Sequence, residues 1–144
     1  MTHVKQKQGA GTCGAVAYAA ILGISELQAI RECKTKMRGR GAGTWHSNVL
    51  EAFEKRGIKA FYIDMKERPR ISEAFWLEPL SAHFPLYVSV SERKNESTHA
   101  IAIANGMIYD GHNDGPAPIE LYETRRIEYM IIVDKELPTY VNQP

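Results

Sequence analysis

The chain has 144 residues and a mass of 16.2 kDa, enough for one domain to bury a core without disulfides or metal ions. A hydrophobic content of 44% and a charged content of 24% are ordinary for a globular protein. The formal net charge of +1 creates no long-range field that would attract nucleic acid or an anionic membrane. We therefore expect a single domain over residues 1–144, with neither nucleic acid nor membrane as a partner.

The N-terminal residues lack the apolar core of a secretory signal. The longest apolar stretch, Ala15 to Leu22, is far shorter than the roughly 20 residues that cross a bilayer. Two cysteines without an export signal favour a reducing, cytoplasmic location, where a thiol stays available for chemistry.

The first part of the chain is expected to be helical. One helix begins near Cys13 and ends around Gly23, and Ser25 with Gln28 predicts a capping box at the start of a second helix. A spacing of three residues predicts the apolar face of this second helix: Ile24, Leu27, Ile30 and Cys33.

A glycine-rich surface loop is expected from Met37 to Gly43. A third helix follows from Trp45 to Arg56, with Gly57 as its stop signal. Ile58 to Ile63 predicts a strand. The apolar residues between 71 and 76 then suggest a short helix that ends before Pro79.

After Pro85 the pattern is that of a sheet. His99 to Ala104 and Met107 to Asp110 predict a hairpin closed by Asn105-Gly106, a pair typical of tight hairpin turns. Three further strands are expected: Leu86 to Val90, Ile119 to Tyr122 and Ile127 to Val133. Helices followed by strands indicate an α+β fold with an antiparallel sheet.

A cysteine stands at the end of a glycine-rich turn and at the start of a small, apolar helix, in the run Gln8 to Gly14. The positive end of a helix dipole favours a thiolate over a thiol, and Gly14 leaves space beside the sulfur. Cys13 is therefore a candidate nucleophile. The alternative is a buried structural cysteine, because cysteine is among the residue types most often buried.

A histidine and an acid follow in the order that a nucleophile, a base and a group orienting the base would need. His99 lies where an apolar strand leaves a polar loop, a place for a general base, although a hydrogen-bonded wall histidine is the alternative. The predicted hairpin brings Asp110 near Ile101 or His99, so it is a candidate orienting group. Asp110 could equally initiate a turn, with Asn113 or Asp114 in its place.

Gln8 is the candidate hydrogen-bond donor to an oxyanion, with Gln6 as the alternative. Cys33 is expected to be a core residue. Trp45 and His46 follow a glycine loop, where they either cap a helix at the surface or line a substrate cleft. The remaining histidines show no metal-ligand spacing with the cysteines, so we expect no zinc site: His3, His83 and His112.

Together these features resemble the papain-like cysteine peptidases, and within them the C39-type, bacteriocin-leader peptidases and their stand-alone relatives. The likeness covers most of the chain. It is carried, in chain order, by Cys13-Gly14 opening an alanine-rich helix, by Gly23 to Leu27, by Gly43 to Ala60, by Pro85 to Val88, and by His99 and Asp110.

The resemblance implies a papain-like fold, with N-terminal helices packed on a C-terminal antiparallel sheet. It also implies Cys13 as nucleophile, His99 as base, Asp110 as the orienting group and a glutamine as oxyanion donor. Two positions depart from the family's pattern. The family's glutamine usually stands six residues before the cysteine, where this chain has Lys7, and its acid is commonly followed by proline, where this chain has Gly111.

The resulting hypothesis is a cysteine peptidase that hydrolyses a peptide or isopeptide bond through a thioester, acting on a peptide or protein and needing no cofactor. Two alternatives use the same triad: an acyltransferase and an amidase that acts on a non-peptide amide. A further enzymatic alternative is a small cysteine–histidine cell-wall amidase of the kind that phages encode. The last alternative is a catalytically inactive binding module of the same fold. The near-neutral charge disfavours the cell-wall enzyme.

Overall fold

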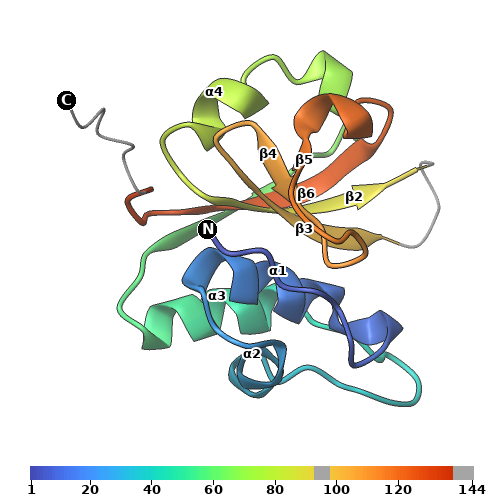
Figure 1. Ribbon diagram of the computed structural model, residues 1–144, viewed down its shortest axis with the longest axis vertical. Helices are drawn as coiled ribbons and strands as arrows, with labels where there is room; N and C mark the ends of the chain where they lie inside the picture. Colours follow the sequence, from blue (N-terminus) through green and yellow to red (C-terminus); the bar gives the residue numbers. More distant parts are fainter. Residues whose placement is uncertain (93–97, 138–144) are drawn as a thin grey trace.

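The computed structural model describes residues 1–92 and 98–137 and is built around a six-stranded sheet. Figure 1 shows α1, α2 and α3 on one side of this sheet and the short helix α4 on the other. The α-helices are α1 (Cys13–Leu22), α2 (Glu26–Glu32), α3 (His46–Lys55) and α4 (Leu77–Ser81). Three short 3-10 helices accompany them: η1 (Ala10–Thr12), η2 (Ile71–Glu73) and η3 (Ile119–Tyr122).

All neighbouring strands of the sheet run antiparallel, in the order β1-β6-β2-β3-β4-β5. The strands are β1 (Ala60–Asp64), β2 (Leu86–Ser91), β3 (His99–Ala104), β4 (Met107–Tyr109), β5 (Ala117–Pro118) and β6 (Arg126–Val133). The α+β class predicted from the sequence is confirmed.

Helix α1 is the central helix, and its residues from Gly14 to Ile21 are all buried. Its many alanines allow it to lie close to β3, whose Ala100 and Ala102 belong to the same core cluster. Gly23 ends the helix in the left-handed conformation, at φ 72°. No single helix in the described ranges is long and apolar enough to cross a membrane, and α1 with α2 reaches that length only as a pair bent by 107°.

A second apolar core lies on the opposite face of the sheet. Side chains alternate between the faces of a strand, so Leu86 and Val88 of β2 face this core while Tyr87 faces the core of α1. The second core is covered by η2, α4 and η3, with Leu77 and Ile119 among the buried contacts. Because both faces are covered, every residue of β2 is buried.

Two elements of the second half differ from the sequence-based expectation. Ile119 to Tyr122 forms η3 and not a strand, and the short strand β5 precedes it at Ala117–Pro118. Pro79 does not end a helix but lies inside α4, within the first turn. Proline is tolerated there because the first backbone N–H groups of a helix have no intrahelical partner.

The buried face of α2 also differs from the prediction. Leu27 is 57% exposed, whereas Glu26 is only 7% exposed. The Glu26 carboxylate accepts hydrogen bonds from the backbone N–H groups of Lys7 and Gln8 and, at 2.9 Å, from the Thr12 hydroxyl. A buried carboxylate is stable only with such partners, so it fixes the turn before α1.

The capping box of α2 forms only in part. Ser25 Oγ accepts the backbone N–H of Gln28 at 3.1 Å, as expected. The Gln28 side chain does not return to Ser25 but donates to Glu32 at 3.1 Å. Glu32 also accepts hydrogen bonds from Arg56 and Tyr18, so the Gln28 amide belongs to a hydrogen-bond network at the end of the helix.

Substitution of Gly14 tests how closely α1 approaches Tyr87 and Thr44. A methyl group at this position would lie 2.5 Å from the Tyr87 hydroxyl and 2.7 Å from Thr44 Cβ. We expect Gly14→Ala to lower the free energy of unfolding by about 1–3 kcal/mol, as overpacked sites do, measured by urea denaturation. Gly11→Ala is the matched control, because its methyl group would meet nothing closer than 3.4 Å. Equal stability of the two variants would contradict the close approach.

Candidate active site

Cys13 is the first residue of α1 and lies half-buried beside the start of β3. The preceding 3-10 turn η1 delivers it to the positive end of the helix. The groups that favour the ionised form of this thiol are the His99 side chain and the backbone N–H groups of Ala100 and Gly14, all of which lower its pKa.

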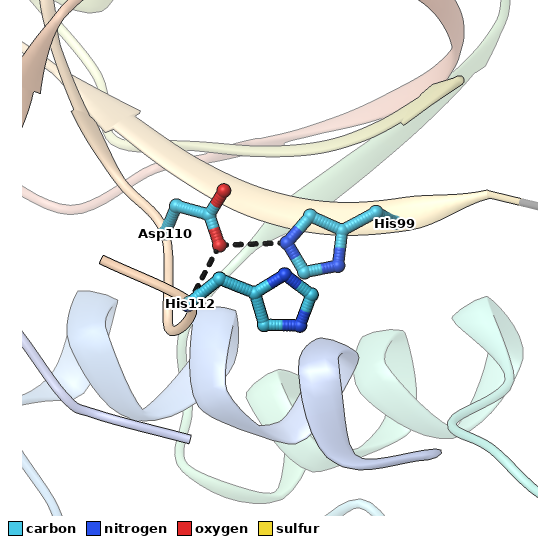
Figure 2. Close-up of side chains that lie close together, drawn as sticks. All are labelled: His99, Asp110 and His112. Carbon is cyan, nitrogen blue, oxygen red and sulfur yellow. Dashed lines mark hydrogen bonds and ion pairs between the residues drawn. The ribbon is translucent and has the colours of Figure 1, made fainter. Parts of the chain in front are cut away.

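His99 is the first residue of β3, and its side chain is 16% exposed. Its Nε2 lies 2.7 Å from Asp110 Oδ1, as Figure 2 shows. Because Nε2 is engaged with the carboxylate, Nδ1 is the ring nitrogen left for Cys13, whose interaction with His99 raises the pKa of the imidazole. The imidazole therefore links the cysteine to the acid.

Asp110 follows β4 directly, and the hairpin geometry places it beside His99. Asn105 and Gly106 adopt φ of 52° and 71°, the backbone of a tight two-residue turn. The resulting register pairs Ala104 with Met107 and Ala102 with Tyr109. The carboxylate then comes level with the beginning of β3, as the sequence analysis predicted.

The Asp110 carboxylate is buried and fully engaged. Besides His99, it accepts the His112 backbone N–H at 2.9 Å and the Tyr122 hydroxyl at 2.6 Å. The sequence analysis missed Tyr122, because an expected strand over 119–122 gave no reason to aim its hydroxyl at Asp110. The 3-10 turn η3 supplies that direction.

The three side chains shift one another's ionisation. Burial raises the pKa of the Cys13 thiol, but the hydrogen bonds and the charge of His99 outweigh it, so the pKa lies below its ordinary value. Burial lowers the pKa of His99, yet its hydrogen bonds to Asp110 and Cys13 raise the pKa to about 9. Burial raises the pKa of Asp110, but its three hydrogen bonds hold that pKa well below the usual range. Near neutral pH these shifts favour a thiolate and an imidazolium beside an ionised carboxylate.

Both candidate glutamines, Gln6 and Gln8, lie in the segment that precedes η1. Gln8 is exposed, and its backbone N–H donates to Glu26. Gln6 is half-buried: its side-chain amide donates to the Gly9 carbonyl at 2.6 Å, and its backbone N–H donates to the Gly111 carbonyl at 2.9 Å. The Gln8 amide is thus the less constrained of the two.

A cavity of about 490 Å³ lies between the glycine-rich loop, the start of α3 and strands β1 and β6. Its lining includes Gly43 and Thr44, which pack against the turn and helix that carry Cys13, and Thr98, which precedes His99. The opposite wall is aromatic: His46 stacks on Tyr62 at 4.4 Å between ring centroids, and Tyr129 lies 5.3 Å from both rings.

Trp45 and His46 both line this cavity, and Trp45 also occupies the exposed N-cap position of α3. Tyr62 and Tyr129 were not found from the sequence, because the pairing of β1 with β6 brings them together and the packing of α3 against β1 adds His46.

One group in the described part of the chain could ligate a metal ion, formed by His99, Asp110 and His112 with ligand atoms within 4.8 Å of one another. Spacing along the sequence did not indicate it, since the three come together only through the hairpin. Its His99 Nε2 and Asp110 Oδ1 already form a hydrogen bond. Cys33 lies apart in the core, where burial raises the pKa of its thiol to about 12.

The arrangement of helices and sheet is that of a solved peptidase domain, in agreement with the papain-like α+β fold that the sequence resemblance implied. A solved structure that resembles it is the peptidase domain of ComA from Streptococcus, a bi-functional ABC transporter involved in a quorum-sensing pathway. The TM-score is 0.63, and the match covers 92% of this chain and 96% of that one. At 17% sequence identity, this structural match shows a shared fold. The sequence matches no protein-family model and no curated protein.

The Cys13 thiolate is testable by its rate of alkylation with iodoacetamide, followed by mass spectrometry as a function of pH. At pH 6.5 only about 1% of an ordinary thiol is ionised. We expect Cys13 to react at least about tenfold faster there than in His99→Ala, because that variant loses the hydrogen bond and charge that stabilise the thiolate. Cys33, with its raised pKa, is the internal control. An ordinary thiol profile in both proteins would make Cys13 a structural cysteine.

Tyr122→Phe tests the support of the carboxylate, since it leaves Asp110 Oδ2 without its donor. We expect a loss of about 1–3 kcal/mol in the free energy of unfolding at pH 7. The lowered pKa of Asp110 stabilises the fold above the unfolded value of about 3.9, and this contribution disappears as pH falls through the folded value.

The loss from Tyr122→Phe should therefore shrink below about pH 4. Urea denaturation at pH 7 and pH 3 measures it, with the exposed Tyr62→Phe as a control that changes stability by less than about 0.5 kcal/mol. A loss that is the same at both pH values would contradict the role of the hydroxyl.

Proposed function

We propose that the protein is a cysteine peptidase that hydrolyses a peptide or isopeptide bond through a thioester intermediate. The observation that carries this proposal is the hydrogen bond between His99 and the buried Asp110 on one side of a ring that, on its other side, lowers the pKa of Cys13. A cysteine at a helix start, a histidine that interacts with it and a buried acid behind the histidine meet the requirements of nucleophile, base and orienting group. The shared fold with a peptidase domain supports the same class of reaction.

In the proposed reaction the Cys13 thiolate attacks the carbonyl carbon and forms a tetrahedral oxyanion. The backbone N–H of Cys13 and the side-chain amide of Gln8 donate hydrogen bonds to that oxygen. The His99 imidazolium gives its proton to the leaving amine, and a thioester on Cys13 remains. Neutral His99 then takes a proton from water, the hydroxide attacks the thioester, and the acid product leaves as the thiolate and imidazolium are restored.

Asp110 keeps the base in place during these steps. Its ionised carboxylate accepts Nε2–H, which directs Nδ1 to Cys13 and stabilises the imidazolium. The carboxylate itself does not exchange a proton, because its pKa is held well below neutral. Tyr122 maintains this by donating to the second carboxylate oxygen.

The aromatic cavity beside Cys13 is the proposed site for the peptide or protein substrate. Trp45 is 60% exposed there, so its indole is available to a substrate side chain. We place the reaction in the cytoplasm, where the thiol remains reduced, and it requires no cofactor.

A diverse peptide library with blocked amines tests the activity on many sequences at once. Wild type is expected to create new amino termini and Cys13→Ala none, and acid-quenched wild type should carry an acyl adduct on Cys13 that hydroxylamine removes. On the best peptide, Gln8→Ala should lower kcat by about 100- to 1000-fold, the typical effect of losing one oxyanion donor.

Gln6→Ala is the matched control for Gln8→Ala and should retain most of the activity. A larger loss in Gln6→Ala would transfer the oxyanion role to Gln6. A reactive Cys13 that cleaves no peptide and forms no adduct would contradict the peptidase and favour a binding module. Product formed only with an added amine would favour an acyltransferase.

A further inference from the structure

A second histidine lies against the proposed base. His112 follows Asp110 by two residues, and its ring stacks on that of His99 with centroids 4.2 Å apart and planes inclined by 21°. Figure 2 shows the His99 ring beside the Asp110 carboxylate and the His112 ring next to that of His99. The backbone N–H of His112 donates to the same Asp110 oxygen that accepts His99 Nε2. One residue thus contacts both the base and its orienting acid.

The turn that carries His112 is held by the N-terminal segment. The Gln6 backbone N–H donates to the Gly111 carbonyl at 2.9 Å, and Lys5 Nζ donates to the His112 carbonyl at 3.2 Å. Lys5 also pairs with Asp114 at 2.9 Å. The His112 ring is exposed, but these contacts fix its backbone, and the ring therefore has a defined place over His99.

The turn at Gly111 packs closely against α1 and the N-terminal segment. A methyl group there would lie 2.7 Å from Val16 Cγ1 of α1 and 2.9 Å from Gln6 Cβ. The turn is thus wedged between the central helix and the N-terminal segment. It cannot move away from His99 without breaking these contacts.

A catalytic imidazole needs such a support because its ring torsion is loosely defined. Rotation about χ2 of histidine is broad and roughly two-fold, so a hydrogen bond at one nitrogen alone leaves the ring able to swing. A flat group on one face limits this rotation and excludes water from that face. A charged group at the same distance would repel the imidazolium.

We propose that His112 is a positioning residue whose stacked ring holds the His99 imidazole in the orientation that joins Cys13 to Asp110. This inference rests on the proposed function, because it assigns His112 a part in the same Cys–His–Asp site. His112 itself exchanges no proton with the substrate.

The charged and titratable groups around the pair are few in the described structure. Asp110 lies behind His99, with Tyr122 of η3 donating to its far oxygen. Cys13 faces His99 from α1. Lys5 reaches the His112 carbonyl from the N-terminal segment. Loss of the stacked ring lets water weaken the His99–Asp110 hydrogen bond, which lowers the pKa of His99, while the accompanying loss of burial raises it. The interactions with Asp110 and Cys13 outweigh burial in the wild-type site, so we expect a net fall, and a lysine at this position adds a like charge that lowers the pKa further.

The test is the pKa of His99, followed through its ring Cε1–H signal by NMR in the intact protein. Wild type is expected to titrate at about 9. His112→Ala should lower this pKa by about one unit and His112→Lys by at least as much, while His112→Phe, which keeps a flat ring, should stay within about 0.3 units of wild type. All variants retain the backbone N–H to Asp110, and thermal unfolding verifies their folding.

His83→Ala is the control, an exposed histidine away from the site that should leave the His99 pKa unchanged. Alkylation of Cys13 gives a second readout: a one-unit fall in the His99 pKa means a tenfold smaller ratio of ion pair to neutral pair. Labelling near neutral pH should therefore slow in His112→Ala and His112→Lys but not in His112→Phe.

A His99 pKa that stays at the wild-type value in all three His112 variants would overturn the inference alone. So would a fall in His112→Phe as large as that in His112→Ala, because the ring would then act through its nitrogens and not through its face. If wild-type His99 titrates near 6.5 and Cys13 behaves as an ordinary thiol, the proposed function and the inference both fail.

Discussion

The close packing of α1 against the sheet is the constraint on which the rest of the structure depends. An apolar helix rich in alanine can lie directly on a strand that presents Ala100 and Ala102, since small side chains on both surfaces leave little separation. This contact brings the start of the helix next to the start of β3. Cys13 and His99, far apart in the sequence, become neighbours as a consequence.

Two buried carboxylates then fix the loops around that contact. Glu26 gathers backbone and hydroxyl donors from the segment before Cys13, and Asp110 gathers His99, Tyr122 and a backbone N–H after β4. A buried charge without partners is costly, so each carboxylate imposes one arrangement on its loop. One defines the approach to the nucleophile and the other defines the orientation of the base.

The likeness to a peptidase domain at 17% identity shows that this frame tolerates extensive sequence change. A core of alternating strand residues under an apolar helix is specified by pattern and volume more than by individual side chains. The details around the proposed site are more particular to this chain. Gly111 stands where the family that the sequence resembles commonly has proline after the acid, and Gly111 and His112 form the turn that packs against α1 and His99.

The sequence by itself determined the limits of α1, the hairpin of β3 and β4, the antiparallel α+β class and the candidates Cys13, His99 and Asp110. These follow from local rules: helix ends, alternation, and an Asn105-Gly106 turn whose register is set by its length. Only the tertiary structure decided that Glu26 is buried and that 119–122 is a 3-10 turn. It alone placed Tyr122 and His112 on the site, because these contacts join segments whose separation in sequence carries no periodic signal.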